Sequence, residues 1–159
     1  MPAVRSVRVQ AEPFDPAAEV DALRAGRPQI GAVVSFLGLM RDLNDGEPVE
    51  SMTLEHYPGM TEKALEAIAA EAAARWALEG IRVVHRVGEL RPEEPIVLVA
   101  VASRHRAEAF RACEFVIDYL KTRAPFWKKE RVAGGERWVA ARHGDSEAER
   151  RWEQPPDGA

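Results

Sequence analysis

The chain has 159 residues, 46% of them hydrophobic and 30% charged, which is enough for one globular domain that needs neither disulfides nor a metal ion to fold. Its net charge of −4 argues against a general affinity for nucleic acid, and its longest apolar run, residues 96–102, is far too short to span a membrane. The single cysteine, Cys113, excludes an internal disulfide and is typical of a protein of the reducing cytoplasm.

The first part of the chain predicts a strand, a helix and a second strand. Residues 6–10 alternate weakly and favour a short strand. Asp15, followed by proline, predicts the N-cap of a helix over residues 16–25, which the next glycine ends. The β-branched residues 31–37 then predict another strand.

The middle of the chain repeats this alternation. Residues 41–48 are rich in turn formers and predict a loop, and residues 49–57 show the period-two pattern of a half-buried strand. Apolar positions at helical spacing then predict an amphipathic helix that ends near Gly80. Two β-branched strands follow, at residues 81–87 and 96–103.

A long helix over residues 104–123 is predicted next, with Ser103 as its N-cap and Pro125 after its end. Residues 126–132 and 136–141 predict a hairpin turned by two glycines. The predicted apolar face of the helix comprises Phe110, Cys113, Val116, Ile117 and Leu120.

Strands and helices are thus interleaved without a regular βαβ period, which indicates one mixed α+β domain. We expect this domain to cover residues 1–152. From Asp145 the chain is highly charged, and residues 153–159, rich in proline and glycine, are expected to form a disordered tail.

Positive charge is concentrated in one stretch. Residues 101–131 carry eight basic and four acidic side chains, a net +4, so the rest of the chain carries −8. A basic stretch within an acidic protein favours a small anionic ligand over a polyanion, although a solvated helix face would produce the same charge run.

The start of the long helix is a candidate anion site. Arg104, His105 and Arg106 follow the expected N-cap, where free backbone N–H groups and the helix dipole favour an anion and disfavour cations. Three basic side chains there are explained by a bound anion, or equally by solvent exposure and ion pairs elsewhere.

A second candidate cluster spans residues 121–130, where a lysine near the helix end and two in the next strand flank a proline turn. In an extended strand Lys128 lies on the side of Phe126, and Lys129 on the opposite side with Trp127. Lys121 alone is also explained by the helix dipole. The four histidines lack metal-ligand spacing, and no phosphate-binding glycine loop is present.

Several separate motifs resemble the large, catalytic subunits of molybdopterin synthase, the MoaE family, from about residue 4 to residue 152. They are the pattern F-x-G-x-x-R-x-x-N-x-G at residues 36–46, LEHYPGM at 54–60, HRVGEL at 85–90, the pair His105-Arg106, and DYLKTRAPFWKKE at 118–130. Their shared order along the chain makes a chance match untenable.

The resemblance implies an α/β-hammerhead-type mixed sheet with packed helices. It also implies a homodimer that binds one small ubiquitin-like subunit at each end, as a heterotetramer. The implied reaction converts cyclic pyranopterin monophosphate to molybdopterin, with sulfur delivered as thiocarboxylate on the C-terminal Gly-Gly of the small subunit. No cofactor or metal is implied. A chain with one cysteine on an apolar helix face has no evident sulfur store, in agreement with an external donor.

The resemblance also assigns residues. Lys121 and Lys128 match the catalytic lysines of the family. The matching substrate-binding positions are Leu39, Met40, Arg41, His105, Arg106, Lys129, Glu130 and Arg142, the last contributed across the dimer. Met40 stands where a valine is common, a change expected to be harmless.

Two rival functions stay open at this point: a non-enzymatic module whose basic stretch docks an acidic protein tail, and a hydrolase or transferase for another phosphorylated metabolite. The preferred hypothesis requires that Lys121, Lys128, His105 and Arg106 meet in one cavity, within a chain or across a dimer.

Overall fold

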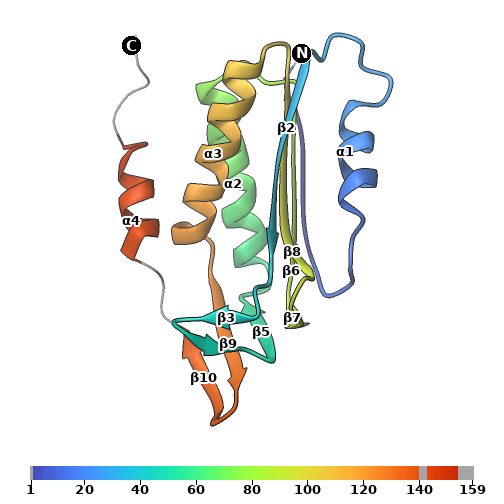
Figure 1. The fold of residues 1–159 in the computed structure, drawn as a ribbon. Coiled ribbons are helices and arrows are strands. Elements are labelled where there is room, and N and C mark those ends of the chain that lie inside the picture. The colour runs from blue at the N-terminus through green and yellow to red at the C-terminus, as the bar shows by residue number, and fades with distance from the viewer. Residues whose placement is uncertain (1, 140–142, 154–159) are drawn as a thin grey trace.

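The computed structural model describes residues 2–139 and 143–153, and Arg142 therefore lies outside the described residues. The chain forms two four-stranded β-sheets and a short two-stranded one, and Figure 1 shows helices packed around the upper four-stranded sheet. In chain order the elements are β1 (Val4–Gln10), α1 (Pro16–Arg24), β2 (Ala32–Leu39), β3 (Leu43–Asn44), β4 (Glu47–Pro48), β5 (Ser51–His56), α2 (Met60–Arg75), β6 (Gly80–Arg86), β7 (Gly88–Leu90), β8 (Pro95–Ser103), α3 (Arg106–Arg123), β9 (Phe126–Val132), β10 (Gly135–Val139) and α4 (His143–Arg150).

The upper sheet has the strand order β1-β6-β8-β2 and is mixed, because β1 and β6 run parallel while the other pairs are antiparallel. Helix α1 covers one face, and α2 and α3 cover the other (Figure 1). Since β8 is covered on both faces, nearly all of its residues are buried, which explains its continuous apolar sequence. The prediction of a mixed α+β domain is confirmed.

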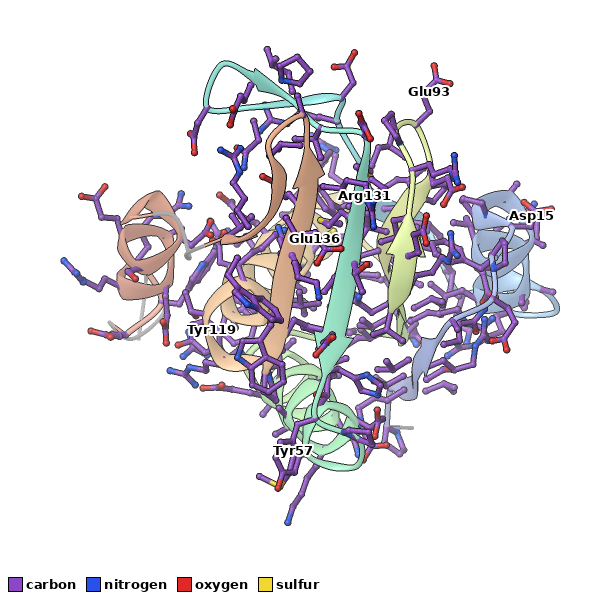
Figure 2. The ribbon with its side chains drawn as sticks, turned by 90° about the horizontal axis from the view of Figure 1, so that it is seen from below. Asp15, Tyr57, Glu93, Tyr119, Arg131 and Glu136 are labelled. Carbon is purple, nitrogen blue, oxygen red and sulfur yellow. The ribbon has the colours of Figure 1, made fainter. Side chains whose placement is uncertain are left out.

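The lower sheet is antiparallel, with the order β10-β9-β5-β7, and has its own small core of Met40, Val49, Met52, Leu54 and Leu90. Figure 2, seen from below, shows Arg131 of β9 beside Glu136 of β10 on the outward face of this sheet. The two sheets meet where α3 ends and β9 begins, so any pocket at this junction has walls from both sheets.

Most sequence-based boundaries are confirmed, including the Asp15 cap, whose carboxylate accepts hydrogen bonds from two backbone N–H groups of α1. The predicted N-cap of the long helix is wrong. Strand β8 continues through Ser103, whose hydroxyl donates to the carbonyl of Ala77 at 2.9 Å, and His105 takes the cap position without a side-chain hydrogen bond.

One further prediction is wrong. Phe110 was expected on the buried face of α3 but is 60% exposed, because the buried stripe instead follows Ala109, Ala112 and Phe115. The charged segment that includes Asp145, for which no element was predicted, belongs to helix α4, and this helix packs on α3. Trp152 anchors it by donating its indole N–H to Asp118 at 2.7 Å. None of the described helices is both long enough and apolar enough to cross a membrane.

Candidate functional site

A cavity of about 610 Å³ lies at the junction of the two sheets. It is bordered by the end of β2, by β6, β8 and β9, by the last turn of α3 and by single residues of β10 and α4. Its polar lining side chains are Arg41, His85, Lys121, Lys128 and Asp145. Four of the predicted site residues, from distant parts of the sequence, are therefore brought together: Leu39, Arg41, Lys121 and Lys128.

The turn between α3 and β9 places the two lysines. Lys121 lies in the last turn of α3, the helix ends at Arg123 before Pro125, and Lys128 is the third residue of β9. The turn is held by the buried side chain of Thr61, whose hydroxyl donates to the carbonyl of Pro125 at 3.1 Å and accepts from the backbone N–H of Tyr57. Both lysines are thus attached to a fixed piece of backbone.

The end of β2 supplies the opposite wall. A register shift between Gly38 and Leu39 bends the strand as it leaves β8, and residues 39 and 41 then line the cavity. A Cβ atom at Gly38 would lie 2.8 Å from a methyl group of Val97, so glycine permits the close approach of the two strands. Met40 is 5% exposed and packs into the lower core instead of lining the cavity.

His85 contributes the most deeply buried polar side chain of the lining. Its ring is stacked on Phe126, with centroids 3.9 Å apart, and its Nδ1 atom lies 2.8 Å from the carbonyl oxygen of Arg86. Burial lowers the pKa of His85 to about 3, and the positive charges of Lys121 and Lys128 add to this effect. The ring is therefore neutral at physiological pH.

Two predicted site residues of β9 lie outside the cavity lining. Lys129 points to the outward face of the lower sheet, where its ammonium group is 3.3 Å from Glu136 and lies over the ring of Trp138. Glu130 is buried, and its carboxylate accepts hydrogen bonds from Asn44 at 3.0 Å and Arg137 at 3.1 Å. Glu130 thereby fastens the β3–β4 hairpin to the lower sheet, close to the segment that carries Arg41.

His105 and Arg106 are not brought to this cavity within one chain. They line a separate hollow of about 510 Å³ at the N-terminal end of α3, together with Gly31 and the exposed ring of Phe110. Arg106 and Lys121 are fifteen residues apart in one helix, which places them about 22 Å apart along its axis.

The approach of β2 to α3 fixes this second hollow. The N–H of Gly31 donates to the carbonyl of Ser103 at 3.0 Å, and a Cβ atom on Gly31 would lie 2.2 Å from the carbonyl oxygen of Arg104. Arg104 itself is paired with Glu79 at 3.2 Å. The cations that remain for a ligand at this hollow are therefore Arg106 and, when protonated, His105.

The part of the cavity lining that the structure describes has the charge of an anion site, because it includes three cationic side chains and one carboxylate, that of Asp145. Such a site binds a phosphate or carboxylate and stabilises negative charge that develops on a reacting carbonyl. Within residues 2–139 and 143–153, no group of three or more potential ligand side chains is arranged to hold a metal ion.

Sequence reasoning assigned no role to several lining residues, above all His85, Phe126 and Asp145. His85 lies in the HRVGEL motif, which carried the resemblance without indicating a function. Asp145 was noted only as the start of a highly charged segment. The sequence offered one signal for His85: it is a histidine within a strand of otherwise mostly apolar, β-branched residues. A histidine in such a strand is more often buried for structural reasons than functional.

Comparisons with known proteins agree with one another. A model of the MoaE protein family matches residues 9–123. The molybdopterin synthase catalytic subunit of Ralstonia nicotianae is 62% identical over 97% of this chain and 88% of that protein. The solved structure of the molybdopterin biosynthesis MoaE protein of Burkholderia ambifaria is 55% identical, with a TM-score of 0.81 over 95% of this chain and 99% of that one.

A more distant structure has the same fold. A protein–protein complex of subunits 1 and 2 of the molybdopterin-converting factor from Helicobacter pylori contains a chain with a TM-score of 0.69, covering 88% of this chain and 92% of that one. Its sequence identity is 19%, so it bears on the fold alone.

Proposed function

The chain belongs to the MoaE family of molybdopterin synthase catalytic subunits, and on this premise we propose that its cavity transfers sulfur from a thiocarboxylated small ubiquitin-like subunit to cyclic pyranopterin monophosphate, giving molybdopterin. The observation that carries the proposal is the convergence of Arg41, Lys121 and Lys128 on one cavity of about 610 Å³. A cavity of this size admits a phosphorylated pterin and the end of a peptide chain.

The chain's own cysteine is unsuited to storing the sulfur. Cys113 is 4% exposed, its thiol lies 3.6 Å from the carbonyl oxygen of Val99, and burial raises its pKa to about 12. The reactive thiolate is therefore scarce at neutral pH. A partner must bring the sulfur in, and a C-terminal Gly-Gly thiocarboxylate is narrow enough to enter the cavity.

We assign the two lysines to the acyl end of the donor. In each transfer a carbon–sulfur bond forms at a carbon of the pterin side chain, a carbon–oxygen bond at that same carbon breaks, and the donor's acyl carbon–sulfur bond breaks. Water supplies the oxygen with which the donor leaves as a carboxylate. Lys121 and Lys128 orient the acyl carbon and stabilise the negative charge on its oxygen. Two donors are consumed for each dithiolene.

A second copy of the chain supplies His105 and Arg106, because one chain holds these residues about 22 Å from its own Lys121 along the axis of α3. Apolar exposure supports this association. The edge strand β2 exposes Phe36, Leu37 and Leu39 by 38%, 38% and 50%, and Phe110 lies beside His105. Arg142 is assigned to the same shared site, and the assembly is a heterotetramer with two small subunits.

The substrate-binding assignments follow the geometry. Leu39 and Arg41 contact the substrate directly, and Arg41 is the ligand of its phosphate. Met40, Lys129 and Glu130 act from outside the cavity, by supporting the backbone around it. A cytoplasmic location is part of the proposal, because a reactive thiocarboxylate donor and a single unpaired cysteine both suit a reducing compartment.

A single-turnover assay with thiocarboxylated small subunit and cyclic pyranopterin monophosphate tests the function. We expect dithiolene product with the intact chain, and about a hundredfold less with Lys121→Ala. Lys63→Ala is the matched control, because Lys63 is exposed on α2, away from the cavity. Full turnover by Lys121→Ala would contradict the catalytic assignment and favour a docking module.

The same assay without the donor tests the other rival. If the chain alone converts the pterin, or releases its phosphate, a hydrolase or transferase for phosphorylated metabolites is the better description. Co-purification of a small protein that ends in Gly-Gly is the expected result for the proposed partner.

A further inference from the structure

His85 is held in one orientation and one tautomer. The carbonyl oxygen of Arg86 can only accept a hydrogen bond, so the Nδ1 atom that lies 2.8 Å from it must carry the proton. The other ring nitrogen, Nε2, then has a free lone pair and is an acceptor. With 4% of the residue exposed, the ring has little room to turn.

The stacking partner of His85 links it to the lysines. Phe126 covers one face of the imidazole at 3.9 Å, with 16° between the ring planes. Phe126 is two residues before Lys128 and lies on the same side of β9, and both residues line the cavity. The imidazole is thus fixed by the strand that carries one lysine and faces the helix end that carries the other.

Acceptors are rare in this lining. Among the described side chains that border the cavity, residues 140–142 being outside the description, only those of His85 and Asp145 can accept a hydrogen bond. Within the described part of the chain, the charges that act on the imidazole come from Lys121 of α3, Lys128 of β9 and His56 of β5, and Arg41 and Asp145 border the same cavity. The guanidinium of Arg86 points elsewhere, to the carbonyl of Ala11 and the carboxylate of Glu94.

We propose that His85 is a positioning residue, whose Nε2 atom accepts a hydrogen bond from the ammonium group of Lys121 and holds that group charged and aimed at the donor's acyl oxygen. This inference rests on the proposed function, which gives Lys121 its task. Lys121 is chosen over Lys128 because its charge has the larger effect on the imidazole. An imidazole that stays neutral adds no competing cation to the anion site.

The first test needs no turnover. The chain has four lysines, at positions 63, 121, 128 and 129, so reductive ¹³C-methylation gives a small set of NMR signals that Lys→Arg variants assign. An acceptor stabilises the charged ammonium, so His85→Phe, which keeps a flat ring against Phe126, is expected to lower the Lys121 pKa by about one unit. His85→Gln offers a neutral acceptor and is expected to restore most of the lost Lys121 pKa. The pKa of Lys63 is expected to be the same in all variants.

Two results would overturn the inference. One is an unchanged Lys121 titration in His85→Phe, and the other is an equal loss in His85→Phe and His85→Gln. A long-range ¹H–¹⁵N spectrum of the wild-type histidines gives a third criterion that holds even if His85→Phe does not fold. An unprotonated Nε2 of His85 at pH 7 is expected, and a protonated one contradicts the assignment.

Single-turnover sulfur transfer then links the geometry to the reaction. In His85→Phe the pKa that governs the alkaline limb of the pH–rate profile is expected to fall by the same one unit, which lowers the rate on that limb about tenfold. A merely structural role of His85 would instead lower the rate at every pH alike. His56→Gln is the matched control and keeps the wild-type limb. If the wild-type chain transfers no sulfur, the proposed function fails while the NMR titration still decides on His85.

Discussion

Lys128 and Lys129 are neighbours in β9, yet their side chains lie on opposite faces of the lower sheet. Lys128 borders the cavity, while Lys129 is 3.3 Å from Glu136 on the outward face. The alternation of an extended strand produces this separation, and it divides two residues that the family motif presents as a pair.

Alanine substitution of the two lysines is expected to give very different enzymes. Lys128→Ala removes a cation from the reacting end of the cavity and should lower single-turnover sulfur transfer about a hundredfold. Lys129→Ala removes a surface ion pair and a contact with the Trp138 ring, both away from the cavity, and should stay within about threefold of wild type. Equal losses in the two variants would contradict the placement of the site on one face of β9.

The anchor of the β3–β4 hairpin predicts a stability change. Glu130→Gln leaves the guanidinium of Arg137 without its buried carboxylate, and because Arg137 is itself partly exposed, we expect a loss of about 2 kcal/mol in the free energy of unfolding. Urea denaturation measures it. Glu136→Gln is the control, since its ion pairs are on the surface and should contribute below about 0.5 kcal/mol.

The sequence predicted the elements well because their signals are local. The Asp15 cap, the alternation around Met52 and Leu54, and the proline after α3 each depend on a few neighbouring residues, and the structure has each of them. The prediction of Ser103 as the helix N-cap failed because a good capping residue can equally end a strand. The hydroxyl of Ser103 donates a hydrogen bond to the carbonyl of Ala77, which lies 26 residues away in the sequence.

The site was only partly accessible from sequence. Arg41 came from motif resemblance, and Lys121 and Lys128 came from both the local lysine cluster and the resemblance. Their convergence depends on sheet order, which no local pattern encodes. The separation of Arg106 from Lys121 could have been predicted, because both lie in one helix of known rise. His85 was missed because a histidine in a buried strand has no local feature that distinguishes a structural role from a functional one.

The contact between β2 and α3 predicts a selective glycine effect. Gly31→Ala places a methyl group 2.2 Å from the carbonyl oxygen of Arg104, so the segment that leads to His105 must move, at a cost of about 3 kcal/mol. Gly134→Ala, whose new methyl group meets nothing within 4 Å, is the control. Thermal unfolding of both variants checks this, and equal melting temperatures would show that the two segments do not pack as described.

The buried imidazole predicts how stability depends on pH. The pKa of His85 is about 3 in the folded chain, below its ordinary value of 6.5, so below pH 6.5 the unfolded chain binds a proton that the folded chain does not. Stability is then lost as pH falls from 6.5 towards 3. Between pH 6.5 and 5 the wild type should lose about 2 kcal/mol more than His85→Phe, measured by urea denaturation. Parallel losses in the two proteins would place a protonatable, exposed imidazole at position 85.

The central claim is that cations from the two ends of α3 serve one site, contributed by two copies of the chain. Mixing the inactive variants Arg106→Ala and Lys121→Ala under conditions of subunit exchange tests it most directly. Half of the dimers are then mixed, and each mixed dimer has one intact site, so sulfur transfer should recover to about a quarter of the wild-type rate. A mixture that stays as inactive as its two components would contradict the account.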